Sequence, residues 1–232
     1  MSLFVLKIIG LITMFLDHYQ FIIGGSEILR VIGRIAFPIF AFTLSEGYVH
    51  TRNLKNYFLR IFGFAVGIQV LFTLFGYGYA VNVFFTLSLG LVAIYILNLR
   101  KNWVKEPFMK IIKAILTAAV LYLAQKFQMD YGAYGILLIM IFNIFRNDKF
   151  KILMNFLILN VLDIIFPNVF QVPDMQMFSL ISLIFIFMYN GKKGRSMKYF
   201  FYLFYPVHFF ILGIIKFFFR KEMITLNVEG YV

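Results

Sequence analysis

The chain contains no cysteine and few charged residues. Without Cys among its 232 residues, it can form no disulfide and offers neither a thiol nucleophile nor a cysteine ligand for a metal. Charged residues make up only 14% of the sequence, against roughly a quarter in a soluble domain, whereas 62% of the residues are hydrophobic. This composition predicts an integral membrane protein.

Apolar runs that approach the roughly 20 residues needed to cross a bilayer recur along the whole chain. We expect residues 1–232 to form a single domain, an all-α bundle of about nine transmembrane helices. The short segment 133–145 leaves counts of eight or ten open. The expected helices span residues 4–23, 31–49, 57–79, 82–98, 107–125, 133–145, 152–166, 175–190 and 199–219.

Lys and Arg alternate between the two ends of these helices. Cytoplasmic loops of membrane proteins are enriched in basic residues, which predicts a cytoplasmic N-terminus in a bacterial cytoplasmic membrane. The net charge of +12 is explained by contact with anionic membrane lipids and requires no nucleic-acid partner. Sixteen of the 22 basic residues fall on the expected cytoplasmic side: Lys7, Arg52, Lys55, Arg60, Arg100, Lys101, Lys105, Lys110, Lys113, Arg146, Lys149, Lys151, Lys192, Lys193, Arg195 and Lys198.

One layer of ionisable residues is expected in the outer third of the membrane. Asp17 and His18 lie near the outer end of the first helix, and Arg34 lies at a similar depth in the second. Such residues are costly in a bilayer and normally face the bundle interior at functional sites. A structural ion pair between Asp17 and Arg34 is one interpretation. Asp17 could alternatively orient the His18 imidazole, which would then act as a general base.

A second polar layer lies at the cytoplasmic end of the second helix. Glu46 and His50 are four residues apart and therefore share one helix face. Thr51, Arg52 and Arg60 follow, and this layer could bind an anionic cofactor from the cytoplasm. Basic residues at a helix end can also be simple interface anchors.

Three further patterns are weaker. "DYGAYG" at 130–135, with Asp130 and Tyr131, is typical of a turn. "FYPVHFF" places Tyr205 and His208 in a proline-containing helix, where a lone histidine often serves packing. Gly63 and Gly67 have the spacing of a helix-packing pair. The three histidines are too dispersed to predict a zinc site, and we expect no bound metal.

The sequence resembles the TraX family, named for the pilin N-acetylase of conjugative plasmids. The resemblance rests on "LDH" in the first helix, "RVIGRIAFPIFAFTLSEGYVHTRNLKNYFLRI", "DYGAYG" and "FYLFYPVHFFIL". It implies a multi-pass membrane acyltransferase that uses acetyl-CoA or another acyl-CoA to modify an amine or hydroxyl at the outer face, such as a pilin, another exported peptide or a glycan. The matching positions are Asp17, His18, Arg34, Glu46, Gly47, Thr51, Arg52 and His208.

Combined with this resemblance, the two layers suggest a mechanism. We expect His18, oriented by Asp17, to be the general base and Arg34 to stabilise the charge that develops on the carbonyl oxygen. Glu46, His50, Thr51, Arg52 and Arg60 would bind coenzyme A, and Asp130, Tyr131, Tyr205 and His208 would contact the acceptor. A proton-coupled or small-molecule transporter and a non-enzymatic membrane assembly subunit are the alternatives. The crowding of polar residues into the first 60 positions favours an enzyme.

Overall fold

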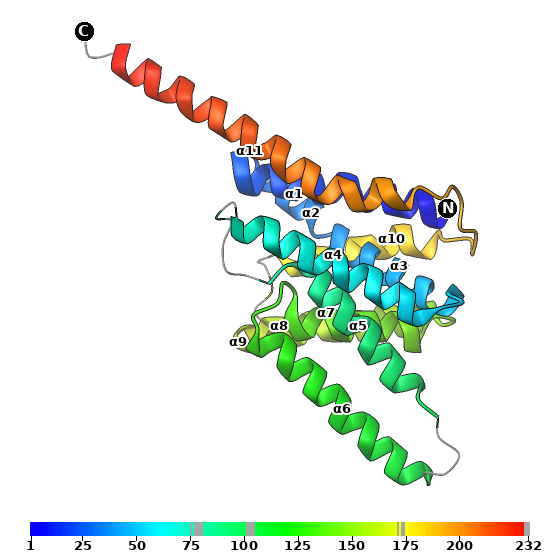
Figure 1. The fold of residues 1–232 in the computed structure, drawn as a ribbon. Coiled ribbons are helices and arrows are strands. Elements are labelled where there is room, and N and C mark those ends of the chain that lie inside the picture. The colour runs from blue at the N-terminus through cyan, green and yellow to red at the C-terminus, as the bar shows by residue number, and fades with distance from the viewer. Residues whose placement is uncertain (75, 77–80, 101–104, 171, 173–174, 230–232) are drawn as a thin grey trace.

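The computed structural model describes residues 1–74, 76, 81–100, 105–170, 172 and 175–229, and the regular elements within these ranges are helices (Figure 1). The predicted all-α fold is therefore confirmed. The elements are α1 (Leu3–Ile23), α2 (Glu27–Gly33), α3 (Ala36–His50), α4 (Leu54–Leu74), α5 (Val83–Asn98), α6 (Glu106–Lys126), α7 (Gly132–Ile144), α8 (Lys149–Ile165), α9 (Pro167–Phe170), the 3-10 helix η1 (Gln176–Ile181), α10 (Ser182–Phe187) and α11 (Lys198–Glu229).

Several helices have the length and apolar composition needed to cross a membrane. Five such segments occur in the described part of the chain, and three shorter apolar helices accompany them. Figure 1 shows the helices lying alongside one another in a bundle, as expected for a multi-pass membrane protein. The five long segments are Leu3–Ile23, Glu27–His50, Leu54–Leu74, Glu106–Lys126 and Tyr199–Phe218.

The predicted helix 31–49 is divided in the structure into α2 and α3, with Arg34 and Ile35 between them. Pro38 lies in the first turn of α3 and provides the physical reason. Proline has no backbone N–H, and its ring clashes with the carbonyl four residues earlier, which belongs here to Arg34. The regular helix therefore breaks at Arg34 and resumes at Ala36.

Three other boundaries differ from the prediction. The segment 175–190 begins with the 3-10 helix η1 and continues as the short helix α10, and α11 extends beyond residue 219. Helix α4 ends at Leu74, and residues 75 and 77–79 of the predicted helix 57–79 lie outside the described residues. The remaining predicted helices agree with the structure to within a few residues.

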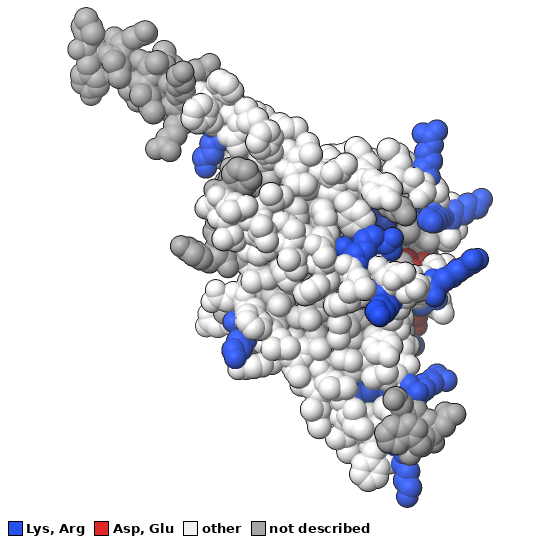
Figure 2. All heavy atoms as spheres, in the orientation of Figure 1, with Lys and Arg blue, Asp and Glu red and all other residues white. Residues whose placement is uncertain are grey.

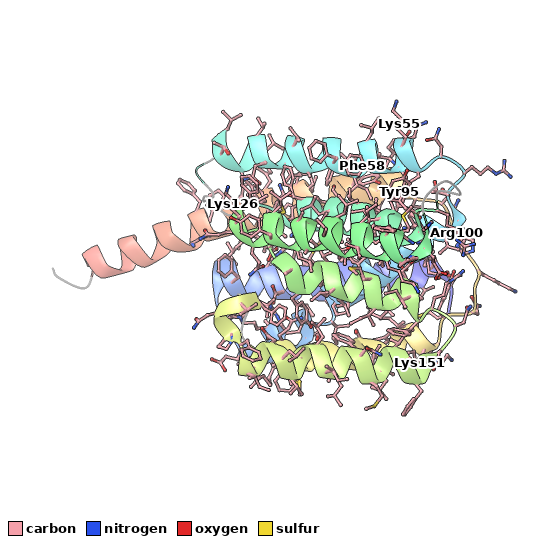
Figure 3. All side chains as sticks on the ribbon, turned by 90° about the horizontal axis from the view of Figure 1, so that it is seen from below. Lys55, Phe58, Tyr95, Arg100, Lys126 and Lys151 are labelled. Atoms are coloured by element: carbon pink, nitrogen blue, oxygen red, sulfur yellow. The ribbon has the colours of Figure 1, made fainter. Side chains whose placement is uncertain are left out.

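The bundle has one strongly basic end. Most of the Lys and Arg side chains visible in Figure 2 gather at one end of the face shown, whereas residues without charge cover most of its middle. Figure 3 shows Lys55, Arg100 and Lys151 at this basic end and Lys126 at the opposite end. The N-terminus also lies at the basic end, where Leu3 N–H donates a hydrogen bond of 2.9 Å to the Lys192 carbonyl.

The helix that carries the longest sequence motif lies in the centre of the bundle. In the most apolar 18-residue stretch of the segment formed by α2 and α3, 67% of the residues are buried, against 11% in that of α6. Helices α1, α5 and α7 pack against α3. The central position of α3 allows polar side chains at both of its ends to face other helices rather than lipid.

Candidate functional site

The first part of the site forms where α1 meets the break between α2 and α3. The Arg34 guanidinium is 3% exposed, and its Nη2 donates a short hydrogen bond to Oδ1 of Asp17 within an ion pair. A Cβ atom at Gly33 would overlap the Asp17 side chain, so the glycine is what allows α2 to approach α1 this closely. Asp17 and Arg34 thus form the predicted ion pair.

Arg34 retains hydrogen-bonding capacity after this pairing. Its Nε donates to the Arg30 carbonyl at 3.4 Å, and Nη2 is held by Asp17. Its Nη1 is buried and has no hydrogen-bond partner among the residues that the structure describes. A fixed guanidinium with a free N–H group can donate to an oxygen that gains negative charge in a reaction.

His18 forms its hydrogen bond with a second histidine. Its Nδ1 lies 2.6 Å from Nε2 of His208 on α11, and the ring centroids are 4.9 Å apart with planes 8° apart. This separation is too large for face-to-face contact and fits a bond that lies in the plane of both rings. Residues adjacent on a helix do not face each other, so Asp17 contacts Arg34 while His18 points to His208. The predicted pairing of Asp17 with His18 is therefore replaced by a pairing with His208.

The turn between α6 and α7 reaches the same region. Asp130 and Tyr131 lie close enough to Arg34 to interact with it electrostatically. The Tyr131 ring stacks on Phe37 with centroids 3.8 Å apart, and its φ of 61° is an uncommon backbone conformation for a residue other than glycine. Tertiary structure thus brings a turn about 100 residues away in sequence to the α2–α3 break.

Tyr205 completes this group from α11. It is buried, and its ring contacts His18 edge-on at a centroid distance of 6.2 Å. The structure therefore brings together all the residues predicted for catalysis and acceptor contact, which we name the outer cluster: Asp17, His18, Arg34, Asp130, Tyr131, Tyr205 and His208.

A cavity of about 470 Å³ lies at the basic end. It is lined by every residue predicted for cofactor binding, namely Glu46, His50, Thr51, Arg52 and Arg60. Its wall also includes Lys7 of α1 and Lys193 and Arg195 of the segment between α10 and α11, which sequence reasoning did not assign to a site. Their only sequence signal was their position on the predicted cytoplasmic side. We name this space the basic cavity.

Glu46 is the acidic residue of the basic cavity and is already paired. Its carboxylate lies 3.4 Å from the Arg146 guanidinium and 3.8 Å from the His50 imidazole. Burial and the nearby Glu46 carboxylate raise the pKa of the Tyr189 hydroxyl, which therefore stays protonated and able to donate a hydrogen bond. The carboxylate thus organises neighbouring side chains and leaves the cations of the cavity available to an anion.

A smaller, mostly apolar chamber of about 140 Å³ adjoins the basic cavity. The two spaces share Lys7, Thr43, Tyr57, Phe201 and Tyr202 in their walls, and the chamber extends to Tyr205 of the outer cluster. Its remaining lining is Leu11, Met14, Phe40, Leu44, Ile61, Val83, Phe84 and Leu87. The apolar chamber therefore lies between the basic cavity and the outer cluster.

The chain has recognisable relatives among known proteins. The model of the family described as "TraX protein" matches residues 2–216 of the chain. A protein of Dichelobacter nodosus named "Probable fimbrial assembly protein FimC, serogroup H1" is 30% identical, with 94% of this chain and 96% of that protein aligned. No solved structure matches. Because the family model covers nearly the whole chain, this protein belongs to the TraX family.

Proposed function

We propose that the protein is a membrane acyltransferase that moves an acyl group, most simply acetyl, from cytoplasmic acyl-CoA to an amine or hydroxyl at the opposite face. The observation that carries this proposal is that the basic cavity and the apolar chamber share part of their walls and that the chamber reaches Tyr205 of the outer cluster. The three parts match a cofactor with an anionic end, a thin arm and a reactive thioester.

The basic cavity is suited to the phosphates of coenzyme A. Five cationic side chains line it, and its glutamate is paired with Arg146. Phosphate oxygens form strong charge-assisted hydrogen bonds with such groups. The positive-inside rule assigns the basic end to the cytoplasm, where acyl-CoA is found. The five cations are Lys7, Arg52, Arg60, Lys193 and Arg195.

The outer cluster supplies the groups that acyl transfer requires. The acceptor nitrogen or oxygen attacks the thioester carbonyl carbon while the free nitrogen of His18 takes the acceptor's proton. The Nη1 group of Arg34 donates to the carbonyl oxygen as that oxygen becomes negative. The C–S bond then breaks, and the proton passes to the departing sulfur, which leaves as the coenzyme A thiol.

The acceptor we propose is an exported pilus subunit or a similar exported peptide. The Dichelobacter nodosus relative is named as a probable fimbrial assembly protein, and the family resemblance implies pilin acetylation. A bacterial cytoplasmic membrane would place the acceptor on the side opposite the basic end. Asp130 and Tyr131 belong to the turn that such an acceptor would approach. A glycan hydroxyl is the other acceptor class with the same chemistry.

A non-enzymatic role in pilus assembly is the second candidate, and the name of the relative favours it. In that case the ion pair of Asp17 and Arg34 would act only as a structural link between α1 and α2. The two candidates differ in whether acyl-CoA is consumed.

The test is acetyl transfer by the purified protein in lipid nanodiscs. Radiolabelled acetyl-CoA is supplied with a peptide acceptor, and transfer and hydrolysis are both measured. His18→Ala should reduce the rate at least about 100-fold, as expected for loss of a general base, with coenzyme A binding nearly unchanged. Asn155→Ala, on α8 outside the cavity and cluster, is the control. A fully active His18→Ala protein would refute the catalytic role.

A further inference from the structure

Two imidazoles and one carbonyl form a directional chain of hydrogen bonds beside the apolar chamber. Nδ1 of His208 lies 2.8 Å from the Phe204 carbonyl oxygen, and Nε2 of His208 lies 2.6 Å from Nδ1 of His18. From this geometry we infer that His208 is a positioning residue that fixes the protonation pattern of His18. This inference deepens the proposed function and rests on His18 being its base.

The direction of these hydrogen bonds is set by the Phe204 carbonyl oxygen. A carbonyl oxygen can only accept a hydrogen bond, so Nδ1 of His208 must carry a hydrogen. A neutral imidazole has one N–H group, which leaves Nε2 of His208 as an acceptor. His208 is 2% exposed within the bundle, and a charged side chain is costly at such a depth, so neutral rings are favoured there.

The protonation of His18 follows from that of His208. Because Nε2 of His208 accepts, Nδ1 of His18 must donate, and the hydrogen of the neutral His18 ring is placed on Nδ1. Nε2 of His18 then has a free lone pair. His18 thus presents a basic nitrogen in one defined direction.

This arrangement also prepares His18 for the charge that it gains. When Nε2 takes a proton, the ring becomes a cation, and its Nδ1–H bond to His208 becomes charge-assisted and stronger. A carboxylate performs this task in serine hydrolases. Here the neighbouring carboxylate of Asp17 is held by Arg34, so a second imidazole takes that place. His208 acts through His18, and the proposal needs no contact between His208 and substrate.

The chain offers a direct readout, because it has only three histidines. Protein labelled with ¹⁵N-histidine gives signals from His18, His50 and His208 alone, and nitrogen shifts distinguish protonated from unprotonated ring positions. In the wild-type protein we expect the hydrogen of His18 on Nδ1. A wild-type spectrum with this hydrogen on Nε2 would overturn the proposal even if no acyl-transfer activity were ever found.

Two substitutions at the same position separate positioning from packing. In His208→Gln the amide oxygen lies near the former Nε2 and can still accept from His18. In His208→Asn the shorter amide can reach the Phe204 carbonyl but leaves His18 without an acceptor. We expect His208→Gln to keep the His18 hydrogen on Nδ1, whereas His208→Asn should allow it to move to Nε2.

Activity gives a second, independent readout. His208→Asn should lower kcat at least about tenfold relative to His208→Gln, with KM for acetyl-CoA within about twofold, because only the orientation of the base changes. Equal His18 spectra or equal kcat values for the two variants would overturn the positioning role. Complete absence of transfer in the wild type would refute the proposed function, while the spectra would still decide the inference about His208.

Discussion

The charge of the basic cavity can be tested by removing two cations from it. The double substitution Arg52→Gln/Arg60→Gln neutralises two of its exposed cations, and Arg60 also contacts the Tyr57 ring, with its guanidinium 5.7 Å from the ring centroid. We expect this protein to bind coenzyme A more weakly. The matched control is Lys55→Gln/Arg100→Gln, because both residues lie at the basic end but not in the cavity wall (Figure 3). Each pair lowers the net charge by the same amount.

The expected size of the effect follows from the exposure of the two arginines. A charge-assisted hydrogen bond contributes roughly 1.5–3 kcal/mol when it is well shielded from water. Both side chains are solvent-exposed, so we take about 1 kcal/mol for each. A total of about 2 kcal/mol corresponds to roughly 30-fold weaker binding. Lys7, Lys193 and Arg195 remain in the wall and should preserve some affinity.

Calorimetric titration with coenzyme A is the suitable assay. Nanodiscs of zwitterionic lipid remove competition by anionic headgroups, and salt at about 0.15 M limits electrostatic effects to roughly 8 Å. Under these conditions the control pair should bind within about twofold of the wild type. Unchanged affinity in Arg52→Gln/Arg60→Gln would identify these arginines as lipid anchors. Equal losses in both pairs would indicate only a general field effect.

Three further predictions concern packing and sidedness. Asp17→Asn leaves the buried Arg34 charge uncompensated and should lower the free energy of unfolding by about 3 kcal/mol. Adding Arg34→Gln should restore stability but not activity. Additive losses of stability in thermal denaturation would contradict this prediction. Gly33→Ala should lower the melting temperature, because the added Cβ atom would overlap the Asp17 side chain. Gly63→Ala, which has open space around it, should not lower the melting temperature. In proteoliposomes of known orientation, acetyl-CoA at the basic end should support modification of an acceptor enclosed on the other side, and a requirement for both on one side would exclude the two-sided mechanism.

The sequence alone determined the class of the protein and the two polar regions. Hydrophobic run length and the alternation of basic residues are local properties, so they predicted the all-α membrane bundle and its basic end. The cost of charge within a bilayer then selected Asp17, His18 and Arg34 as interior residues. For Glu46 to Arg60, closeness in sequence was sufficient, because these residues lie at the end of α3, in the turn that follows it and in the first two turns of α4.

Only the tertiary structure decided which side chains meet across helices. Hydropathy does not determine which face of α11 packs on α1, so it could not pair His18 with His208 or place Lys193 and Arg195 beside Arg52.

The glycines are a second case in which the tertiary structure decided what the sequence pattern did not. Gly33 allows close contact with Asp17. A Cβ atom added at Gly63 or Gly67 would meet no atom of a neighbouring element within 4 Å. The packing role predicted from the four-residue spacing of Gly63 and Gly67 is therefore wrong within the described chain. Spacing describes one helix, but packing depends on the surface of its neighbour.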